Sequence, residues 1–312
     1  MSDPLSDALA LVRARCRITG GFRAGGSWSV RLRPDVPIKI DALVEGHCWL
    51  IADGRQPMLI EAGDAVVLNQ AGAFTLCSDP DLPPIEESDA LVRSGGPLSQ
   101  IGTGSEVVIL GGHVEMDSGG EELLLPVLPS ITHVDGHAPQ ATELRTLLER
   151  LLDETTAGRP GAAFATTQYA QLLLVQVLRL ALEQQAVTRP GWLALLGDPA
   201  LRPALALMHE DPGHPWGLEE LARAAAMSRT TFATRFRAAS GEPPLSYLTR
   251  WRMRLAEQAL RETDTTIAAL ASRLGYASES SFSHAFQRTT GITPGRYRRG
   301  RDTQADGARV AR

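Results

Sequence analysis

Two related stretches decide the fold: Met227–Leu260, MSRTTFATRFRAASGEPPLSYLTRWRMRLAEQAL, and Ile267–Arg299, IAALASRLGYASESSFSHAFQRTTGITPGRYRR. They belong to an internal repeat in which apolar and turn residues return at a fixed distance. Four positions recur 49 residues later, namely Leu218, Leu221, Ala222 and Ala225 as Ile267, Leu270, Ala271 and Leu274. Five more recur 50 residues later, namely Phe232, Phe236, Gly241, Pro244 and Tyr247 as Phe282, Phe286, Gly291, Pro294 and Tyr297. Such a repeat indicates two copies of one supersecondary unit.

Each copy has the pattern of a helix-turn-helix unit. The run LEELARAAA predicts a first helix, and RTTFATRFRAAS predicts a second helix that starts after the N-cap residue Ser228. In the other copy, IAALASRLG and ESSFSHAFQRTT take these places, with Ser278 as the N-cap. The paired phenylalanines stand at i and i+4, so they are predicted to lie on the buried face.

The face opposite the phenylalanines is predicted to meet double-stranded promoter DNA. A recognition helix reads base edges with the outward side chains near its N-terminus. The candidates for base reading are Arg229, Thr230, Ala233, Thr234, Glu279, Ser280, Ser283 and His284. The candidates for phosphate contacts, with structural ion pairs as the alternative, are Arg235, Arg237, Arg250, Arg254, Arg288 and Arg298.

The segment between the copies, Leu245–Glu262, is predicted to form one continuous helix with an apolar side. A rigid helix here would hold the two units at a fixed separation. Two recognition helices about 34 Å apart would enter successive major-groove segments on one face of the duplex. One chain would then read a long site without dimer symmetry.

The charge distribution separates this part of the chain from the rest. The 312 residues carry a net charge of −5, yet Trp216–Arg299 contains thirteen arginines against seven acidic residues, a net of +6. The remainder therefore sums to −11. A basic domain joined to an acidic one is expected when only one part contacts nucleic acid. Arginine supplies almost all of the positive charge, because Lys39 is the only lysine.

The N-terminal half has a different pattern. After a predicted short helix that reaches about residue 18, short strand-like runs separated by turns extend from residue 27 to 113, with Asp53-Gly54 as a hairpin signal. They predict a β-sandwich or barrel, and residues 79–105 are predicted to form a long loop. Helices are predicted over 140–153, 162–185 and 199–209, and their apolar faces leave internal packing and a dimer interface both open.

These patterns together predict an α+β protein. An N-terminal cupin-like β-barrel sensor domain is expected over residues 1–125, and a helical linker or dimerisation region over 126–211. An all-α domain with two helix-turn-helix units is expected over 212–300, and the tail, 301–312, is expected to be disordered.

The quoted repeat resembles the AraC/XylS family of transcription regulators. The resemblance continues upstream in GHCWLIADG, IEAGDAVVLNQAGA and GWLALLGDPALRPALALMHEDPGHPW, which look like the subfamily with a cupin-type N-terminal domain. It implies a sensor barrel, a linker often used for homodimerisation, and a double helix-turn-helix DNA-binding domain. It also implies control of transcription through RNA polymerase.

A metal-dependent cupin enzyme with an appended binding module is the alternative class. Such cupins carry an HxH pair and a glutamate, whereas the comparable stretch here reads IKIDALVEGHCW. Asp41 stands near the place of a first histidine, and Glu45 with His47 does not complete a three-ligand site. The sequence therefore predicts no catalytic residue, no metal and no cofactor.

Two hypotheses address the signal that this sensor domain receives. Cys16 stands between Arg15 and Arg17, and positive neighbours that lower the pKa of a thiol would favour reaction with an oxidant; a spectator thiol is the alternative. The competing hypothesis is a small-molecule effector in the barrel. Its candidate lining residues, for which core packing is an equal explanation, are Trp28, Trp49 and Phe74.

The ends and apolar segments bear on location. The N-terminus carries acidic residues and lacks the basic region of a secretory signal. The most apolar window, Leu172–Leu182, is interrupted by Gln176 and Arg179 and is too short to cross a bilayer. We expect a cytoplasmic protein without a membrane partner.

Overall fold

The computed structural model describes residues 3–52, 54–92, 97–117, 120–121, 124–187 and 189–299. Asp53 of the predicted hairpin and the predicted tail, 301–312, lie outside these residues. The chain forms two compact units. The β unit is Val12–Arg189, and the helical unit combines Met1–Leu11 with Pro190–Arg312.

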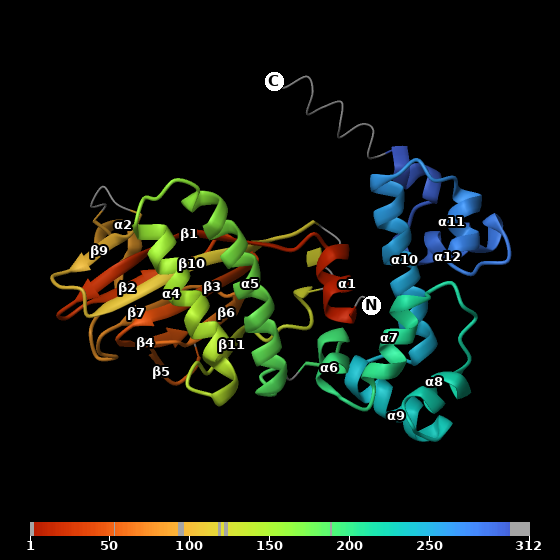
Figure 1. Cartoon of the computed structure of the whole chain (residues 1–312), viewed down its shortest axis with the longest axis horizontal. Coiled ribbons are helices and arrows are strands. Elements are labelled where there is room, and N and C mark those ends of the chain that lie inside the picture. Colours follow the sequence, from red (N-terminus) through yellow and green to blue (C-terminus); the bar gives the residue numbers. More distant parts are fainter. Residues whose placement is uncertain are drawn as a thin grey trace. The chain divides into compact units, whose positions relative to one another are not determined.

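The β unit contains two open sheets (Figure 1). The six-stranded sheet has the order β11-β6-β3-β10-β1-β9 and is antiparallel except where β1 pairs with β9. Its strands are β1 (Arg15–Gly25), β3 (Ile38–Glu45), β6 (Ala65–Asn69), β9 (Ser99–Gly102), β10 (Val107–Glu115) and β11 (Ile131–Val134). The second sheet has the order β5-β4-β7-β2-β8. Its strands are β2 (Ser29–Leu32), β4 (His47–Ala52), β5 (Met58–Glu61), β7 (Phe74–Cys77) and β8 (Ile85–Glu86).

Alternate residues of both sheets face each other and form the core of this unit. Val30 and Leu32 of β2 lie in one apolar cluster with Leu43 of β3 and Ile109 of β10. The period of two that places every second side chain inward is the property of a strand that the sequence pattern detects. The unit is therefore built of two packed sheets, and together with the helices that follow they confirm the predicted α+β class.

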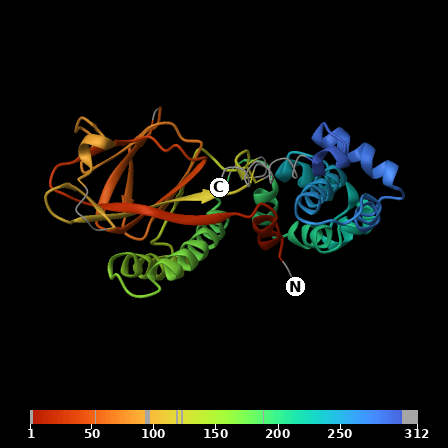
Figure 2. The same cartoon turned by 90° about the horizontal axis from the view of Figure 1, so that it is seen from above.

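Two helices cover the outer face of the six-stranded sheet (Figure 2). They are α4 (Thr142–Thr156) and α5 (Ala162–Glu183), close to the predicted helices. Gln171 of α5 donates to the carbonyl of Ala14 at 2.8 Å and accepts from the Cys16 amide at 3.0 Å. The first strand is thereby bonded to the covering helix through its backbone.

Two local predictions in this half are wrong. The first helix, α1 (Pro4–Leu11), ends earlier than predicted, because Arg13 has a φ of 50° and the chain turns into β1 at Arg15. The predicted loop over 79–105 contains β8, the short helix α2 (Glu87–Ala90) and β9. β8 and β9 each add to an edge of a sheet by parallel pairing, which a sequence pattern of Pro, Gly, Ser and Asp does not reveal.

The helical unit combines α1 with all helices after residue 190, and α1 packs against α6, α7 and α10. These later helices are α6 (Trp192–Gly197), α7 (Arg202–Glu210), α8 (Leu218–Ala224), α9 (Arg229–Ser240), α10 (Pro244–Glu262), α11 (Ile267–Arg273) and α12 (Glu279–Thr290). Of these, α6 was not predicted. Over the described part of the chain, none of the helices has the length and apolar character needed to cross a membrane.

Candidate DNA interface

The first helix-turn-helix unit is made of α8 and α9. Ser228 caps α9, because its hydroxyl accepts a hydrogen bond from the Thr231 amide at 3.2 Å. Phe232 and Phe236 are fully buried, with ring centres 5.5 Å apart, and the ring of Tyr247 meets Phe236 edge-on at 5.6 Å. The helix orientation is thus fixed by an aromatic core beneath it.

The second unit, α11 and α12, repeats this arrangement. Ser278 and Ser281 form a reciprocal capping box at the start of α12. Phe282 and Phe286 are fully buried 5.8 Å apart, and Tyr297 meets Phe286 edge-on at 5.4 Å. Both recognition helices end at a glycine with positive φ, Gly241 at 82° and Gly291 at 79°. The repeat found in the sequence is therefore a repeat of structure.

The predicted base-reading residues lie at the beginnings of the two recognition helices. Six of the eight are exposed: Arg229, Thr230, Thr234, Glu279, Ser280 and His284. The remaining two, Ala233 and Ser283, are half-buried at equivalent positions of the repeat. Each of the two helices therefore has exposed polar side chains on the face opposite its buried phenylalanines.

The six arginines predicted to contact phosphate divide into two groups. Four have partners within the chain. Arg235 forms a forked bond to Asp198 at 2.6 and 2.8 Å, and Arg254 bonds Glu257 at 3.1 Å. Arg250 pairs with Glu242, and Arg298 donates to the carbonyl of Thr265.

The other two, Arg237 and Arg288, are exposed and form no ion pair with any residue that the structure describes. Arg237 lies on α9 and Arg288 on α12, each near the C-terminal end of its recognition helix. A planar guanidinium that forms no internal ion pair can bind a phosphate group.

The loop before α8 and the connecting helix α10 link the two helix-turn-helix units. Arg252 of α10 donates to the carbonyls of Pro212 and His214, the latter at 2.8 Å, and its guanidinium lies over the Tyr276 ring at 5.9 Å. A Cβ on Gly275 would lie 2.1 Å from the carbonyl oxygen of Gly213. The segment before the first unit thus contacts the turn of the second unit, a contact that the sequence analysis missed.

A buried histidine beside the first unit was also missed. His209 of α7 stacks on Trp251 at 3.8 Å, and its Nε2 lies 2.8 Å from the Tyr247 hydroxyl. Its Nδ1 lies 3.8 Å from the carboxylate of Asp7 on α1. Burial lowers the pKa of His209, although the nearby carboxylate of Asp7 acts in the opposite direction.

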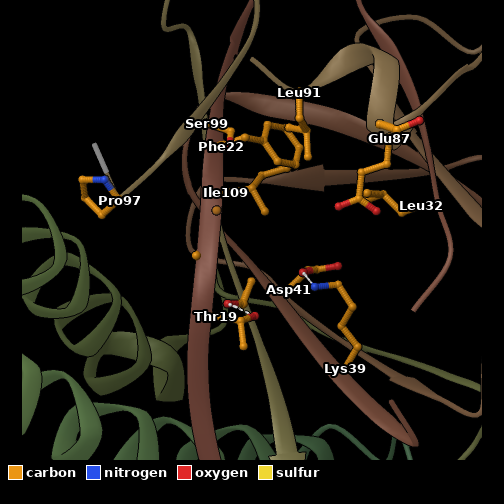
Figure 3. A pocket seen from close by; sticks show the side chains of 14 residues that line it. Thr19, Phe22, Leu32, Lys39, Asp41, Glu87, Leu91, Pro97, Ser99 and Ile109 are labelled. Atoms are coloured by element: carbon orange, nitrogen blue, oxygen red, sulfur yellow. Dashed lines mark hydrogen bonds and ion pairs between the residues drawn. The ribbon is translucent and has the colours of Figure 1, made fainter. Parts of the chain in front are cut away.

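The β unit contains a cavity of about 900 Å³ (Figure 3). Its lining does not include Trp28, Trp49 or Phe74, the predicted effector residues. Trp28 and Phe74 lie instead in the apolar core, and Trp49 is half-buried on β4. Charged residues of β3 and α2 line the cavity together with apolar side chains of β1, β2 and β10.

The cavity contains a charged pair whose sequence signal went unrecognised. Lys39 Nζ lies 2.9 Å from the carboxylate of Asp41, and both side chains point inward from β3. In the stretch IKIDALV, two opposite charges stand at i and i+2 on an apolar strand, so both lie on one face. Among the described residues, no group of histidines, cysteines and acids could hold a metal ion.

The expectation that neighbouring arginines lower the pKa of the Cys16 thiol is wrong. Cys16 is 1 % exposed, and burial raises its pKa to about 12. Arg15 and Arg17 stand next to it on a strand, so their side chains point to the opposite face, where Arg17 pairs with Glu115 at 3.3 Å. Burial likewise raises the thiol pKa of Cys48 to about 12 and of Cys77 to about 11.

Comparisons with known proteins agree with this two-part organisation. Residues 3–183 match the family model described as Cupin, and residues 221–300 match the model described as Helix-turn-helix domain. A Streptomyces lividans protein named a putative AraC-like transcription regulator is 39 % identical over 298 residues, which cover 95 % of this chain and 98 % of that protein.

Two further matches cover smaller parts of the chain. The RCS-specific HTH-type transcriptional activator RclR of Escherichia coli is 37 % identical over 162 residues, 52 % of this chain and 57 % of that protein. The solved DNA-binding domain of AdpA in complex with a target DNA is 30 % identical, with a TM-score of 0.32, over 34 % of this chain and 96 % of that chain.

The paired helix-turn-helix units and the full-length relatives define a DNA-binding transcription regulator. More narrowly, the chain belongs to the AraC family, and it carries a cupin domain ahead of its DNA-binding domain.

Proposed function

We propose that α9 and α12 read two successive major-groove segments of one promoter site. The observation that carries this proposal is the equivalent exposure of the first residues of both helices above matching aromatic cores. Thr230 and Thr234 suit thymine methyl groups or base edges, Glu279 suits the cytosine amino group, and His284 suits guanine.

We further propose that phosphate contacts come from Arg237 and Arg288. Arg235, Arg250, Arg254 and Arg298 instead stabilise the helical unit through their internal partners. Control of transcription through RNA polymerase is part of the proposal because it follows from the family. Homodimerisation stays a prediction, supported by the exposed Phe164 and Leu172 on α5.

For the signal, we favour an effector in the cavity of the β unit over an oxidant at Cys16. Reaction with an oxidant requires a thiolate. At neutral pH a thiol with a pKa of about 12 is almost entirely protonated, and Cys16 also lies out of contact with solvent. The cavity, in contrast, has the mixed polar and apolar lining of a small-molecule site.

Binding selection with the full-length protein on genomic fragments, followed by fluorescence anisotropy, tests the DNA reading. Thr234→Ala and His284→Ala are each expected to change base preference at one position by about 1–3 kcal/mol. The two affected positions should lie about one helical turn apart. Thr167→Ala, an exposed threonine on α5, is the matched control and should change nothing. Unchanged preference in both variants would refute the proposed reading.

A further inference from the structure

We propose that the cavity of the β unit binds a small organic amine, with the ammonium group placed between Asp41 and Glu87. This inference rests on the proposed function, in which the cavity holds the effector. It concerns the chemical class of that effector, which follows from three features of the lining.

The first feature is an unused acceptor. Asp41 is 8 % exposed, and one of its carboxylate oxygens lies 2.9 Å from Lys39 Nζ. Its other oxygen, Oδ2, is buried and has no hydrogen-bond donor among the described residues. A buried carboxylate oxygen that accepts no hydrogen bond lowers the stability of the protein. A ligand that donates an N–H group to this oxygen removes that penalty, and the free energy gained contributes to binding.

The second feature is the charge balance. The ionisable residues of the lining are Lys39, Asp41 and Glu87, which carry a net charge of −1 when all three are ionised. Figure 3 shows the Glu87 side chain directed from α2 across the cavity toward the Lys39–Asp41 pair. A ligand with one positive charge makes the lining neutral, whereas a carboxylate ligand increases the negative excess. Coulomb energy in this partly enclosed space therefore favours a cation.

The adjoining cavity does not reverse this balance. Its additional charged groups are Arg33 and Asp35, together with His113. Arg33 is already bonded to Glu86 at 3.1 Å, and His113 lies 3.4 Å from Glu115.

The third feature is an apolar wall beside the charges, formed by Phe22, Leu32, Leu91 and Ile109. An amine that carries an aromatic or aliphatic body removes this surface from water, which a metal ion or a simple ammonium ion does not. Gly111 keeps the charged pair open to the cavity, since a Cβ there would lie 3.0 Å from Lys39 Nζ and 3.1 Å from Asp41 Oδ1.

Calorimetric titration of the full-length protein tests the class with three probes of similar shape: phenethylamine, phenethyl alcohol and phenylpropanoate. We expect the amine to bind about tenfold or more tightly than the carboxylate. Glu87→Gln, at an exposed position, and Asp41→Asn should each remove most of that preference. Asp89→Asn is the matched control, because Asp89 is exposed on the same helix α2 and lines neither cavity.

DNA affinity measured with each probe separates the two proposals. A preference for the amine that Glu87→Gln abolishes supports the inference. If that preference occurs while the DNA affinity stays unchanged, the amine class stands and the effector role of the cavity fails. Equal or tighter binding of phenylpropanoate, binding unaffected by Glu87→Gln, or no binding of any probe at millimolar concentration would overturn the amine class.

Discussion

In the first helix-turn-helix unit, the hydroxyl of Tyr247 contacts the buried imidazole of His209, whereas the equivalent Tyr297 in the second unit accepts a hydrogen bond from Arg261. His209 belongs to α7 and Arg261 to α10, the helices that precede the two units in the chain. The two units thus have equivalent aromatic cores. They differ in the side chain that connects each core to the helix before it.

The same contrast holds on the recognition helices. Arg235 on α9 reaches Asp198 just after α6, whereas its equivalent on α12 is Ala285, which is buried in the core. The core of the second unit is drawn from α10, α11 and α12. The comparison shows that the repeated residues specify the two helix-turn-helix units. Residues outside the repeat specify the contacts that fix each unit to the rest of the helical unit.

The largest effects are expected from the shared cores. Phe236→Ala and Phe286→Ala each remove a fully buried ring at equivalent positions, and each should lower the free energy of unfolding by about 3–5 kcal/mol. Chemical denaturation of the full-length protein, followed by tryptophan fluorescence and circular dichroism, measures both losses. A loss below about 1 kcal/mol in one variant would show that the cores are not equivalent.

The second largest loss of stability is expected when the Arg252 contact between the two helix-turn-helix units is removed. Arg252→Met removes two bonds from a charged donor to carbonyls, so the helical unit should lose about 1.5–3 kcal/mol. Affinity for a site with both DNA segments should fall more than affinity for one segment, because the two units are no longer held in register. Arg223→Met, at an exposed position, is the control. If Arg252→Met weakened binding to both DNAs equally, the proposed role of Arg252 would be contradicted.

Acid should affect the first unit more than the second. The folded-state pKa of His209 is lowered by burial, so the unfolded chain binds its proton at a higher pH than the folded chain does. Stability is therefore greatest above the ordinary histidine pKa of about 6.5 and falls below it, with a slope of at most about 1.4 kcal/mol per pH unit. Denaturation of His209→Gln between pH 5 and about 7.5 should show a weaker dependence, and an unchanged slope would exclude His209 as the cause.

The smallest effect distinguishes two arginines of α9. Arg237→Ala should weaken binding to all DNA sequences and reduce the slope of log affinity against log salt by about one, because one phosphate contact is lost. Arg235→Ala removes an internal bond to Asp198 and should leave that slope unchanged. Anisotropy titrations at several salt concentrations measure the two slopes. A reduced slope for Arg235→Ala and an unchanged slope for Arg237→Ala would assign the phosphate contact to Arg235 instead.

The features that repeat or alternate along the chain were predictable from the sequence. The paired phenylalanines, the N-cap serines and the connecting helix follow from spacing alone, and the structure has all of them. The helix α6 was missed because WLALLG is only six residues long and lies between Gly191 and Asp198.

Contacts between distant residues were not predictable. Arg235 and Asp198 are 37 residues apart, and no local pattern connects them. From the sequence, Asp41 enters only as part of an incomplete metal motif, because the sequence does not show that Glu87 faces Asp41 from another element. For Cys16, adjacency in sequence suggested a charge effect, but alternation along the strand separates the thiol from both arginines.

The central claim, that the two units form one rigid pair, is tested most directly by changing the spacing within a bound DNA site. Insertion of half a helical turn, about five base pairs, between the segments read by α9 and α12 turns them to opposite faces of the duplex. Fluorescence anisotropy with the full-length protein should then show an affinity loss of about a hundredfold or more. Equal affinity for the original and the extended site would contradict the rigid pair.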